Sequence, residues 1–167
     1  TRYTYNSRNQ ALTVTDALGR VTAYTYDANG NLTSTKDALG NSTSATYSKG
    51  GLLASAVDAQ GNTTRFEYDA TGKVVKVTDH RGQVTAYTYD ANGNRLTESA
   101  ARTAPSGAVE TLTTTFRYDR LNRLVKATYP DGSAVVTVYN SVGQKSADVD
   151  QVGRRTGYED DGAGRAV

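Results

Sequence analysis

A stretch of 21 residues decides the fold of this chain: Asp16-Ala-Leu-Gly19-Arg-Val-Thr22-Ala-Tyr24-Thr-Tyr26-Asp27-Ala-Asn-Gly30-Asn-Leu32-Thr-Ser-Thr-Lys36. It holds two turn signals and two segments rich in Thr, Val and Tyr, and Asp37 begins the next copy. Those residue types favour strands, while Asp followed by Gly three residues later favours a tight turn. Each copy is therefore predicted to form a β-hairpin.

The aromatic residues repeat with the same period. Of the 14 aromatic residues, only Tyr129 lies outside two positions of the repeat. Along the first of these positions every step is 21 residues except the 29 residues from Tyr89 to Tyr118. A fixed period of this size indicates stacked units that pack on their neighbours rather than around one central core. Column 1 consists of Tyr5, Tyr26, Tyr47, Tyr68, Tyr89, Tyr118 and Tyr139, and column 2, two residues earlier, of Tyr3, Tyr24, Phe66, Tyr87, Phe116 and Tyr158.

Each copy has one turn directly after column 1, the column-1 turn, and a second one that we call the opposite turn. The Asp carboxylate can accept backbone N–H groups, and Gly, or Asn in its place, suits a positive φ. For the column-1 turn this predicts a hairpin loop with a bulge. Its predicted residues are Asp27, Gly30, Gly51, Asp69, Gly72, Asp90, Gly93, Asn122 and Gly143; those of the opposite turn are Asp37, Gly40, Asp58, Gly61, Asp79, Gly82 and Gly153.

The odd period constrains the two turns, because directly paired residues of antiparallel strands share a face. If the column-1 turn has a three-residue loop that places Tyr26 opposite Leu32, the opposite turn needs an even loop or a bulge. We therefore expect a four-residue loop from Asp37 to Gly40, with Leu32 opposite Ala45. All repeated aromatics then lie on one face, in a ladder interleaved with Leu32, Leu53, Val74 and Leu124. The predicted fold class is all-β, a repetitive antiparallel hairpin meander in a twisted, curved sheet.

Eight extra residues fall between Thr97 and Thr113, around Pro105. They predict an inserted loop at 97–113, for example the tip of an extended hairpin. Surface insertions are tolerated at low cost, so a length variation is favoured over a binding loop. Residues 1–167 are expected to form a single array, and a piece of a longer one, because neither end has the distinct capping repeat that such arrays need.

Composition excludes several classes of function. The net charge is +2 with acids and bases interspersed, which argues against a nucleic-acid surface. The sequence contains no apolar run long enough to predict a membrane-spanning segment. It also contains no cysteine, and the absence of disulfides does not decide between a secreted and a cytosolic protein. His80 is the single histidine and occupies a turn, so no catalytic residue, cofactor or metal site is expected.

Two sharper readings compete with the structural one. Residues 27–31 and 90–94 place oxygen side chains ahead of and after a glycine, as calcium loops do, but no bidentate Glu follows at the required spacing, so a turn role is favoured. The aromatic rows, with Asp, Asn and Thr between them, could instead stack on sugar rings. A carbohydrate-binding or adhesive module, with glycans as ligands, is therefore the alternative function.

The repeat Asp-x-x-Gly-x-x-Thr-x-Tyr-x-Tyr-Asp-x-x-Gly-x-Leu resembles the Rhs or YD repeat family. The resemblance covers nearly the whole chain and weakens at Ser48, at Asn140 and at Asp160, where Tyr is expected. The dipeptide that names the repeat occurs as Tyr26-Asp27, Tyr68-Asp69, Tyr89-Asp90 and Tyr118-Asp119.

The resemblance implies a spiralling β-sheet that closes into a hollow shell, as in bacterial Rhs polymorphic toxins, insecticidal toxin complexes and teneurins. It implies a non-enzymatic scaffold in a secreted or cell-surface bacterial protein, with neighbouring repeats and an enclosed C-terminal toxin domain as partners. Self-association through open sheet edges is a further expectation. The family's Asp-Pro release motif is missing, since Pro130 precedes Asp131, so no cleavage function is assigned.

Overall fold

The computed structural model describes residues 1–103 and 107–158. These residues form strands and turns, and no helix long and apolar enough to cross a membrane occurs among them. The chain divides into two compact units, residues 1–84 and 85–167, which are considered separately below. The tip of the insertion at 104–106 and the copy beyond residue 158 lie outside the described residues.

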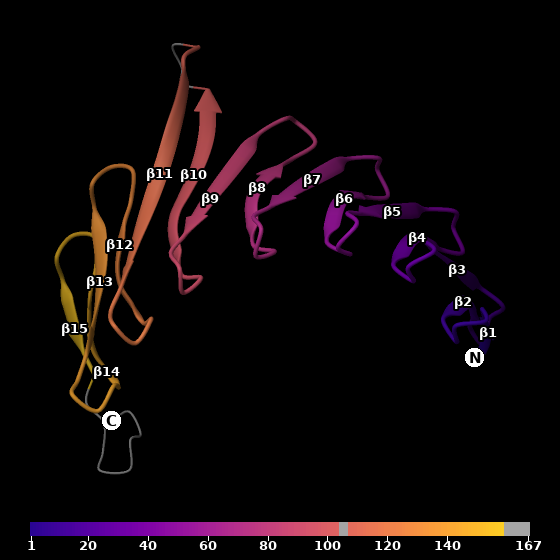
Figure 1. The fold of residues 1–167 in the computed structure, drawn as a ribbon, viewed down its shortest axis with the longest axis horizontal. Helices are drawn as coiled ribbons and strands as arrows, with labels where there is room; N and C mark the ends of the chain where they lie inside the picture. The colour runs from indigo at the N-terminus through magenta and orange to yellow at the C-terminus, as the bar shows by residue number, and fades with distance from the viewer. Residues whose placement is uncertain (104–106, 159–167) are drawn as a thin grey trace. The chain divides into compact units, whose positions relative to one another are not determined.

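Unit 1 is an antiparallel meander in which each strand pairs with the next one along the chain (Figure 1). The predicted hairpin repeat is confirmed: after a first strand of four residues, six-residue strands that end in column 1 alternate with five-residue strands. The strands are β1 (Arg2–Tyr5), β2 (Ala11–Thr15), β3 (Val21–Tyr26), β4 (Leu32–Lys36), β5 (Ser42–Tyr47), β6 (Leu53–Val57), β7 (Thr63–Tyr68) and β8 (Val74–Thr78).

Unit 2 continues the same alternation, with successive strands paired antiparallel from β9 onward. The insertion at 97–113 lengthens two paired strands of one hairpin, the form expected as an example, so residues 97–103 and 109–113 lie in strands and not in a loop. The strands are β9 (Val84–Tyr89), β10 (Arg95–Thr103), β11 (Val109–Tyr118), β12 (Leu124–Thr128), β13 (Ala134–Tyr139), β14 (Lys145–Val149) and β15 (Arg155–Gly157).

Both kinds of turn have the same main-chain structure. Asp27 N donates to Asn31 O (2.9 Å) and Gly30 N to Asp27 O (3.0 Å), and Asp37, Gly40 and Asn41 repeat this pattern in the opposite turn. Each loop thus has three residues between a closing pair, with the last in a left-handed conformation. The expected four-residue loop at Asp37 is wrong.

The irregularity that the odd period requires lies in the column-1 hairpin. Tyr26 pairs with Leu32 as predicted, but Thr25 pairs with Ser34, so Thr33 is an extra, bulged residue. After this hairpin comes the Asp37 turn, where Lys36 pairs with Ser42. In this register Ala45 does not pair with Leu32, so that predicted pair is wrong. One bulge per repeat therefore compensates for the odd period of 21 residues, and the tyrosines lie on one face of the sheet as expected.

The sheet has almost no conventional core. Among the described residues, only the side chains of Ala127 and Ala147 are buried to the level of a hydrophobic interior. The stability of each unit must come from strand ladders, cross-strand side-chain pairs and turn hydrogen bonds. Local features of each repeat therefore carry the fold.

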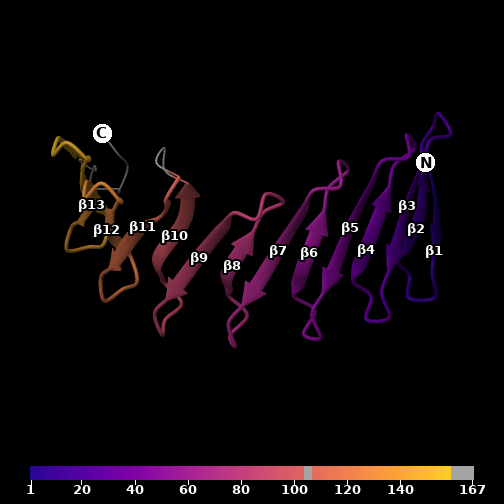
Figure 2. The same ribbon diagram turned by 90° about the horizontal axis from the view of Figure 1, so that it is seen from above.

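The two edges of each unit differ. Column-1 turns lie along one edge and opposite turns along the other (Figure 2). Neighbouring column-1 turns touch: Gln10 Nε2 donates to Gly30 O (2.8 Å) in unit 1, and Arg123 Nη1 donates to Gly143 O (3.0 Å) in unit 2. At the opposite turns, a Cβ on Gly40 or Gly61 would meet nothing within 4 Å. Successive hairpins thus hydrogen-bond turn to turn at the column-1 edge.

Candidate interaction surface

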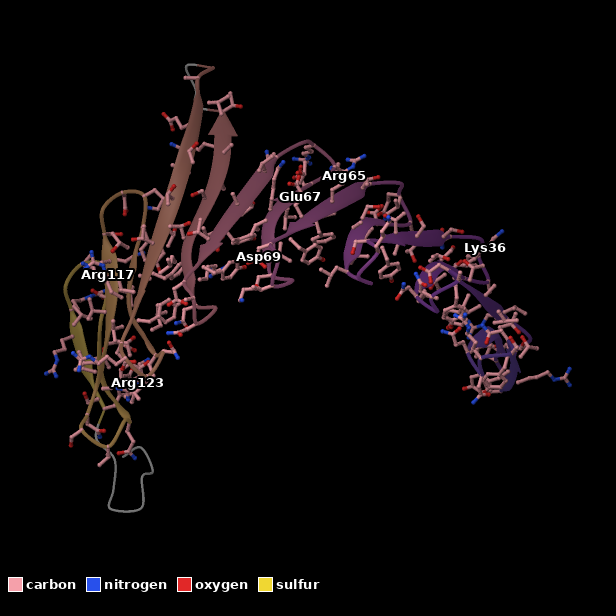
Figure 3. The ribbon with its side chains drawn as sticks, viewed as in Figure 1. Lys36, Arg65, Glu67, Asp69, Arg117 and Arg123 are labelled. Carbon is pink, nitrogen blue, oxygen red and sulfur yellow. The ribbon has the colours of Figure 1, made fainter. Side chains whose placement is uncertain are left out.

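The register divides the strands of unit 1 into two faces. We call the side that carries columns 1 and 2 the aromatic face and the other side the polar face. Tyr24 pairs with Thr35, and Thr35 pairs with Thr43, so β3, β4 and β5 contribute to the aromatic face in sequence. Lys36, Arg65 and Glu67, labelled in Figure 3, belong to the polar face.

No charged side chain of a unit 1 strand lies on the aromatic face. This face carries aromatic, aliphatic and small hydroxyl side chains, whereas the polar face also carries an ion pair between Lys76 Nζ and Glu67 Oε1 (2.8 Å). The strand residues of the aromatic face in β3 to β7 are Thr22, Tyr24, Tyr26, Leu32, Thr35, Thr43, Ala45, Tyr47, Leu53, Ala56, Thr64, Phe66 and Tyr68.

Column 1 has a hydrogen-bonding role that the sequence analysis missed. The Tyr26 hydroxyl donates to the carbonyl of Ala11 on the neighbouring strand at 2.9 Å. The β2–β3 ladder ends at the pair Thr13–Ala23, so the hydroxyl binds a carbonyl just beyond the end of the ladder. The same contact joins Tyr47 to Leu32, Tyr68 to Leu53, Tyr118 to Arg95 and Tyr139 to Leu124, at 2.9–3.2 Å.

The sequence did contain a signal for this role. All seven aromatic residues of column 1 are Tyr, although Asp160 stands at its next position, whereas column 2 accepts Phe66 and Phe116, and Ala45 and Thr137 stand at two of its positions. A position that needs only a ring tolerates Phe, but one that needs a donor for a carbonyl does not. Column 1 therefore ties each hairpin to the preceding strand, while column 2 supplies ring surface.

The aromatic face of unit 2 differs by carrying ion pairs. Arg95 Nη1 lies 2.8 Å from Glu98 Oε2, at the positions that Leu32 and Thr35 occupy in β4. The Arg95 guanidinium also lies 4.6 Å from the centroid of the Phe116 ring, a cation–π contact.

A second ion pair, between Lys145 and Asp148, occupies the same two repeat positions in β14. Asp148 also accepts hydrogen bonds from the hydroxyls of Thr137 and Tyr158, both at 2.9 Å. The hydrogen bond from Lys145, followed by those from the two hydroxyls, lowers the pKa of Asp148. The bonded carboxylate conversely raises the pKa of Lys145 and of Tyr158. The Asp148 carboxylate is thus paired with one cation and two hydroxyl donors.

The turn carboxylates are occupied by their own loops. Asp27 Oδ1 accepts from the backbone N–H of Asn29 and of Asn31, both at 2.9 Å, and its Oδ2 accepts from the Asn31 side chain. These bonds, the side-chain one foremost, lower the pKa of Asp27. The described residues contain no group of three or more His, Cys, Asp or Glu placed to hold a metal.

The predicted turn residues adopt the required backbone. Positive φ angles between 77° and 92° occur at Gly30, Gly40, Gly51, Gly61, Gly72, Gly82, Gly93, Gly143 and Gly153, and Asn122 has φ 60°. The carboxylates of Asp37, Asp58, Asp69, Asp79 and Asp90 each accept backbone N–H groups from residues two and four positions later.

Comparisons with known proteins agree with this geometry. The model of the RHS Repeat family matches residues 5–43, 47–79, 68–109 and 100–134. A search of curated proteins gave no match. Among solved structures, a chain of the Photorhabdus luminescens Tc holotoxin pore with the mutation TccC3-D651A aligns over 99% of this chain, with a TM-score of 0.80 and 19% identity.

Further solved structures are of the TcdB2-TccC3-TEV and TcdB2-TccC3 proteins, with TM-scores of 0.48 and 0.46, 14% and 15% identity, and 99% of this chain covered in both. This chain spans 10% of the holotoxin chain and 13% of the other two. At these identities the holotoxin chain shows a shared fold, which confirms the all-β antiparallel meander. The family matches cover most of the sequence, and the chain therefore belongs to the RHS repeat family.

Proposed function

We propose that this array is a wall segment of an RHS-type shell that encloses a C-terminal toxin or effector polypeptide, and that it has no enzymatic activity of its own. The observation that carries the proposal is the aromatic face of unit 1. It is a broad surface without charged strand residues. The hydroxyls of Tyr26, Tyr47 and Tyr68 on this face donate to backbone carbonyls of the sheet. A surface of this kind can border a polypeptide without binding one sequence tightly.

The construction of the sheet supports the same proposal. Tyrosine hydroxyls join hairpins to the preceding strand, as Tyr26 does, and several neighbouring hairpins are also joined at the column-1 edge, as Gln10 is to Gly30. Such joints repeat with the sequence, so more copies enlarge the wall without a new kind of contact. The proposed partners are neighbouring repeats of the parent shell and its enclosed domain, and the parent is proposed to be secreted or displayed at a bacterial surface.

Limited proteolysis of the parent protein tests enclosure. The C-terminal polypeptide should resist a nonspecific protease until the temperature at which the array unfolds, and changing Tyr26, Tyr47 and Tyr68 to Phe should lower both temperatures together. Cleavage of that polypeptide in the native parent at the rate of the isolated polypeptide would refute enclosure. Turnover in hydrolase assays of the array alone would refute the non-enzymatic role.

Self-association through sheet edges remains a prediction. All four residues of β1 are exposed, and this strand pairs with β2 on one side. Unpaired backbone groups of an edge strand can pair with a second chain. Light scattering at rising protein concentration should show dimers, whereas a monomer throughout that range would contradict the prediction.

A further inference from the structure

Column 2 is interrupted in the middle of unit 1. Tyr24 in β3 and Phe66 in β7 place rings on the aromatic face, but the intervening strand β5 has Ala45 at this position. Ala45 pairs directly with Ala56 of β6, so two methyl groups face each other where neighbouring hairpins pair a ring with Thr35 or Val77. The aromatic face therefore lacks one ring between two that are present.

A groove of about 420 Å³ lies at this interruption. Its apolar walls include Leu32, Leu53, Ala45 and Ala56, and Tyr47 also lines it. A closed cavity of about 150 Å³ is large enough to bind benzene, so the open groove can admit a phenyl or phenol ring. The bound ring would cover the aliphatic side chains of the groove. In the neighbouring hairpins the column-2 rings of Tyr24 and Phe66 occupy this place.

The charge around the groove limits what can bind. The strand residues that line it are uncharged, and the single charged residue of its lining is Asp58, in the opposite turn after β6. Hydrogen bonds from the side chain and the backbone N–H of Asn62 lower the pKa of Asp58, which keeps the carboxylate negative at neutral pH. An uncharged ring therefore suits the part of the groove that the strand residues line. A cationic residue next to that ring in the ligand suits the part of the groove near Asp58.

We propose that the groove at Ala45 binds one aromatic side chain of an extended basic polypeptide segment, which supplies the ring missing from column 2. In unit 2 the chain itself pairs a cation with rings in this way, because Arg95 lies between Tyr87 and Phe116 on the aromatic face. The inference goes beyond the proposed wall function, since it assigns one place on the face and one class of ligand. It would hold even if the array enclosed nothing.

The test uses the full 167-residue chain, labelled for methyl NMR, with four probes: p-cresol and the capped peptides Lys-Phe-Lys, Glu-Phe-Glu and Lys-Ala-Lys. We expect p-cresol and Lys-Phe-Lys to shift the methyl signals of Ala45, Ala56 and Leu53. Lys-Ala-Lys should not shift them. Glu-Phe-Glu should bind more weakly than Lys-Phe-Lys, and Asp58→Asn, which keeps the turn acceptor, should reduce that difference.

Three variants locate the site. Ala45→Tyr fills the groove from within and should weaken p-cresol binding about tenfold, the loss expected when a ring can no longer be buried. Thr46→Tyr is its matched control, because Thr46 is the following residue of β5, lies exposed on the polar face and does not line the groove. If Ala45→Tyr fails to fold, Ala56→Val narrows the same groove with a residue that β2 and β8 already carry there, as Val14 and Val77.

Three results would overturn the proposal. The first is the absence of methyl shifts with both p-cresol and Lys-Phe-Lys. The second is equal weakening by Ala45→Tyr and Thr46→Tyr. The third is saturable binding of a sugar such as N-acetylglucosamine at these methyl groups without any binding of p-cresol, which would assign the groove to carbohydrate.

Discussion

The tyrosine hydroxyls of column 1 should carry measurable stability, and β3 offers a matched pair of residues for testing this. Tyr26 and Tyr24 lie two residues apart on the same face of one strand. The Tyr26 hydroxyl donates to Ala11 O at 2.9 Å, whereas the Tyr24 hydroxyl forms no hydrogen bond to a residue in the described part of the chain. Changing either residue to Phe keeps the ring and removes one oxygen, so the comparison isolates the hydrogen bond.

The expected magnitude follows from the position of the acceptor. A neutral hydrogen bond contributes about 1 kcal/mol net, and this one is partly buried, so water can replace it only in part. We expect Tyr26→Phe to lower the free energy of unfolding by about 1 kcal/mol, because the Ala11 carbonyl lies beyond the last β2–β3 pair. Tyr24→Phe should change it by less than about 0.5 kcal/mol, as is usual for a surface substitution.

Native-state hydrogen exchange is the appropriate assay, because a repeat array need not unfold in one step. A loss of about 1 kcal/mol should speed the exchange of amides in β2 and β3 about fivefold in Tyr26→Phe, with little change in β7 and β8. Equal effects of the two variants would refute the reasoning, since ring packing alone would then account for column 1. A neutral Tyr26→Phe would refute it as well.

Other perturbations test the turns and the ion pairs. The bonds from loop N–H groups lower the pKa of turn carboxylates such as Asp27 below the unfolded value of about 3.9, so their contribution to stability is present above that pH and is lost as the pH falls through the lowered pKa values. The midpoint of thermal unfolding should therefore shift to lower temperature in that acidic range. A constant midpoint down to about pH 2 would contradict the assignment. Gly40→Ala should lower the free energy of unfolding by about 1 kcal/mol because of the φ of 90° alone, since an added Cβ would meet no atom within 4 Å. Gly40→Asn should lower it by less. Equal urea midpoints for the two variants would contradict the role of the positive φ. Arg95→Leu leaves Glu98 without its cation and should destabilise unit 2, by less than about 1 kcal/mol because both side chains are partly exposed. Adding Glu98→Val gives an apolar pair like that of β8 and should recover the loss in the same urea titration. A double variant no better than the single one would contradict the ion-pair account.

The hairpin repeat could be derived from the sequence because its determinants are local. Asp27 and Gly30 specify a turn by hydrogen bonding and by backbone conformation, and both effects act within five residues. The assignment of all tyrosines to one face followed from the period and the pleat together. The family resemblance rested on the same local pattern, and the family model matches most of the chain.

The place of the bulge could not be derived, because parity requires one irregularity per repeat without saying where it occurs. From the loop lengths we expected it at the Asp37 turn, but the bulge lies at Thr33, inside the preceding hairpin. Both solutions return Tyr47 to the face of Tyr26. The choice depends on how closely adjacent strands approach, which is a property of the paired sheet and not of one turn.

The sequence by itself determined the strands, the turns and the face on which the rings lie, since each is set by residues a few positions apart. Tertiary structure decided that the Tyr26 hydroxyl reaches Ala11, that Gln10 touches Gly30, and that Ala45 and Ala56 meet in a groove. These contacts join residues 11 to 20 positions apart, and they exist only after strand pairing has fixed the register. Function in this array is therefore sought where paired strands bring side chains together.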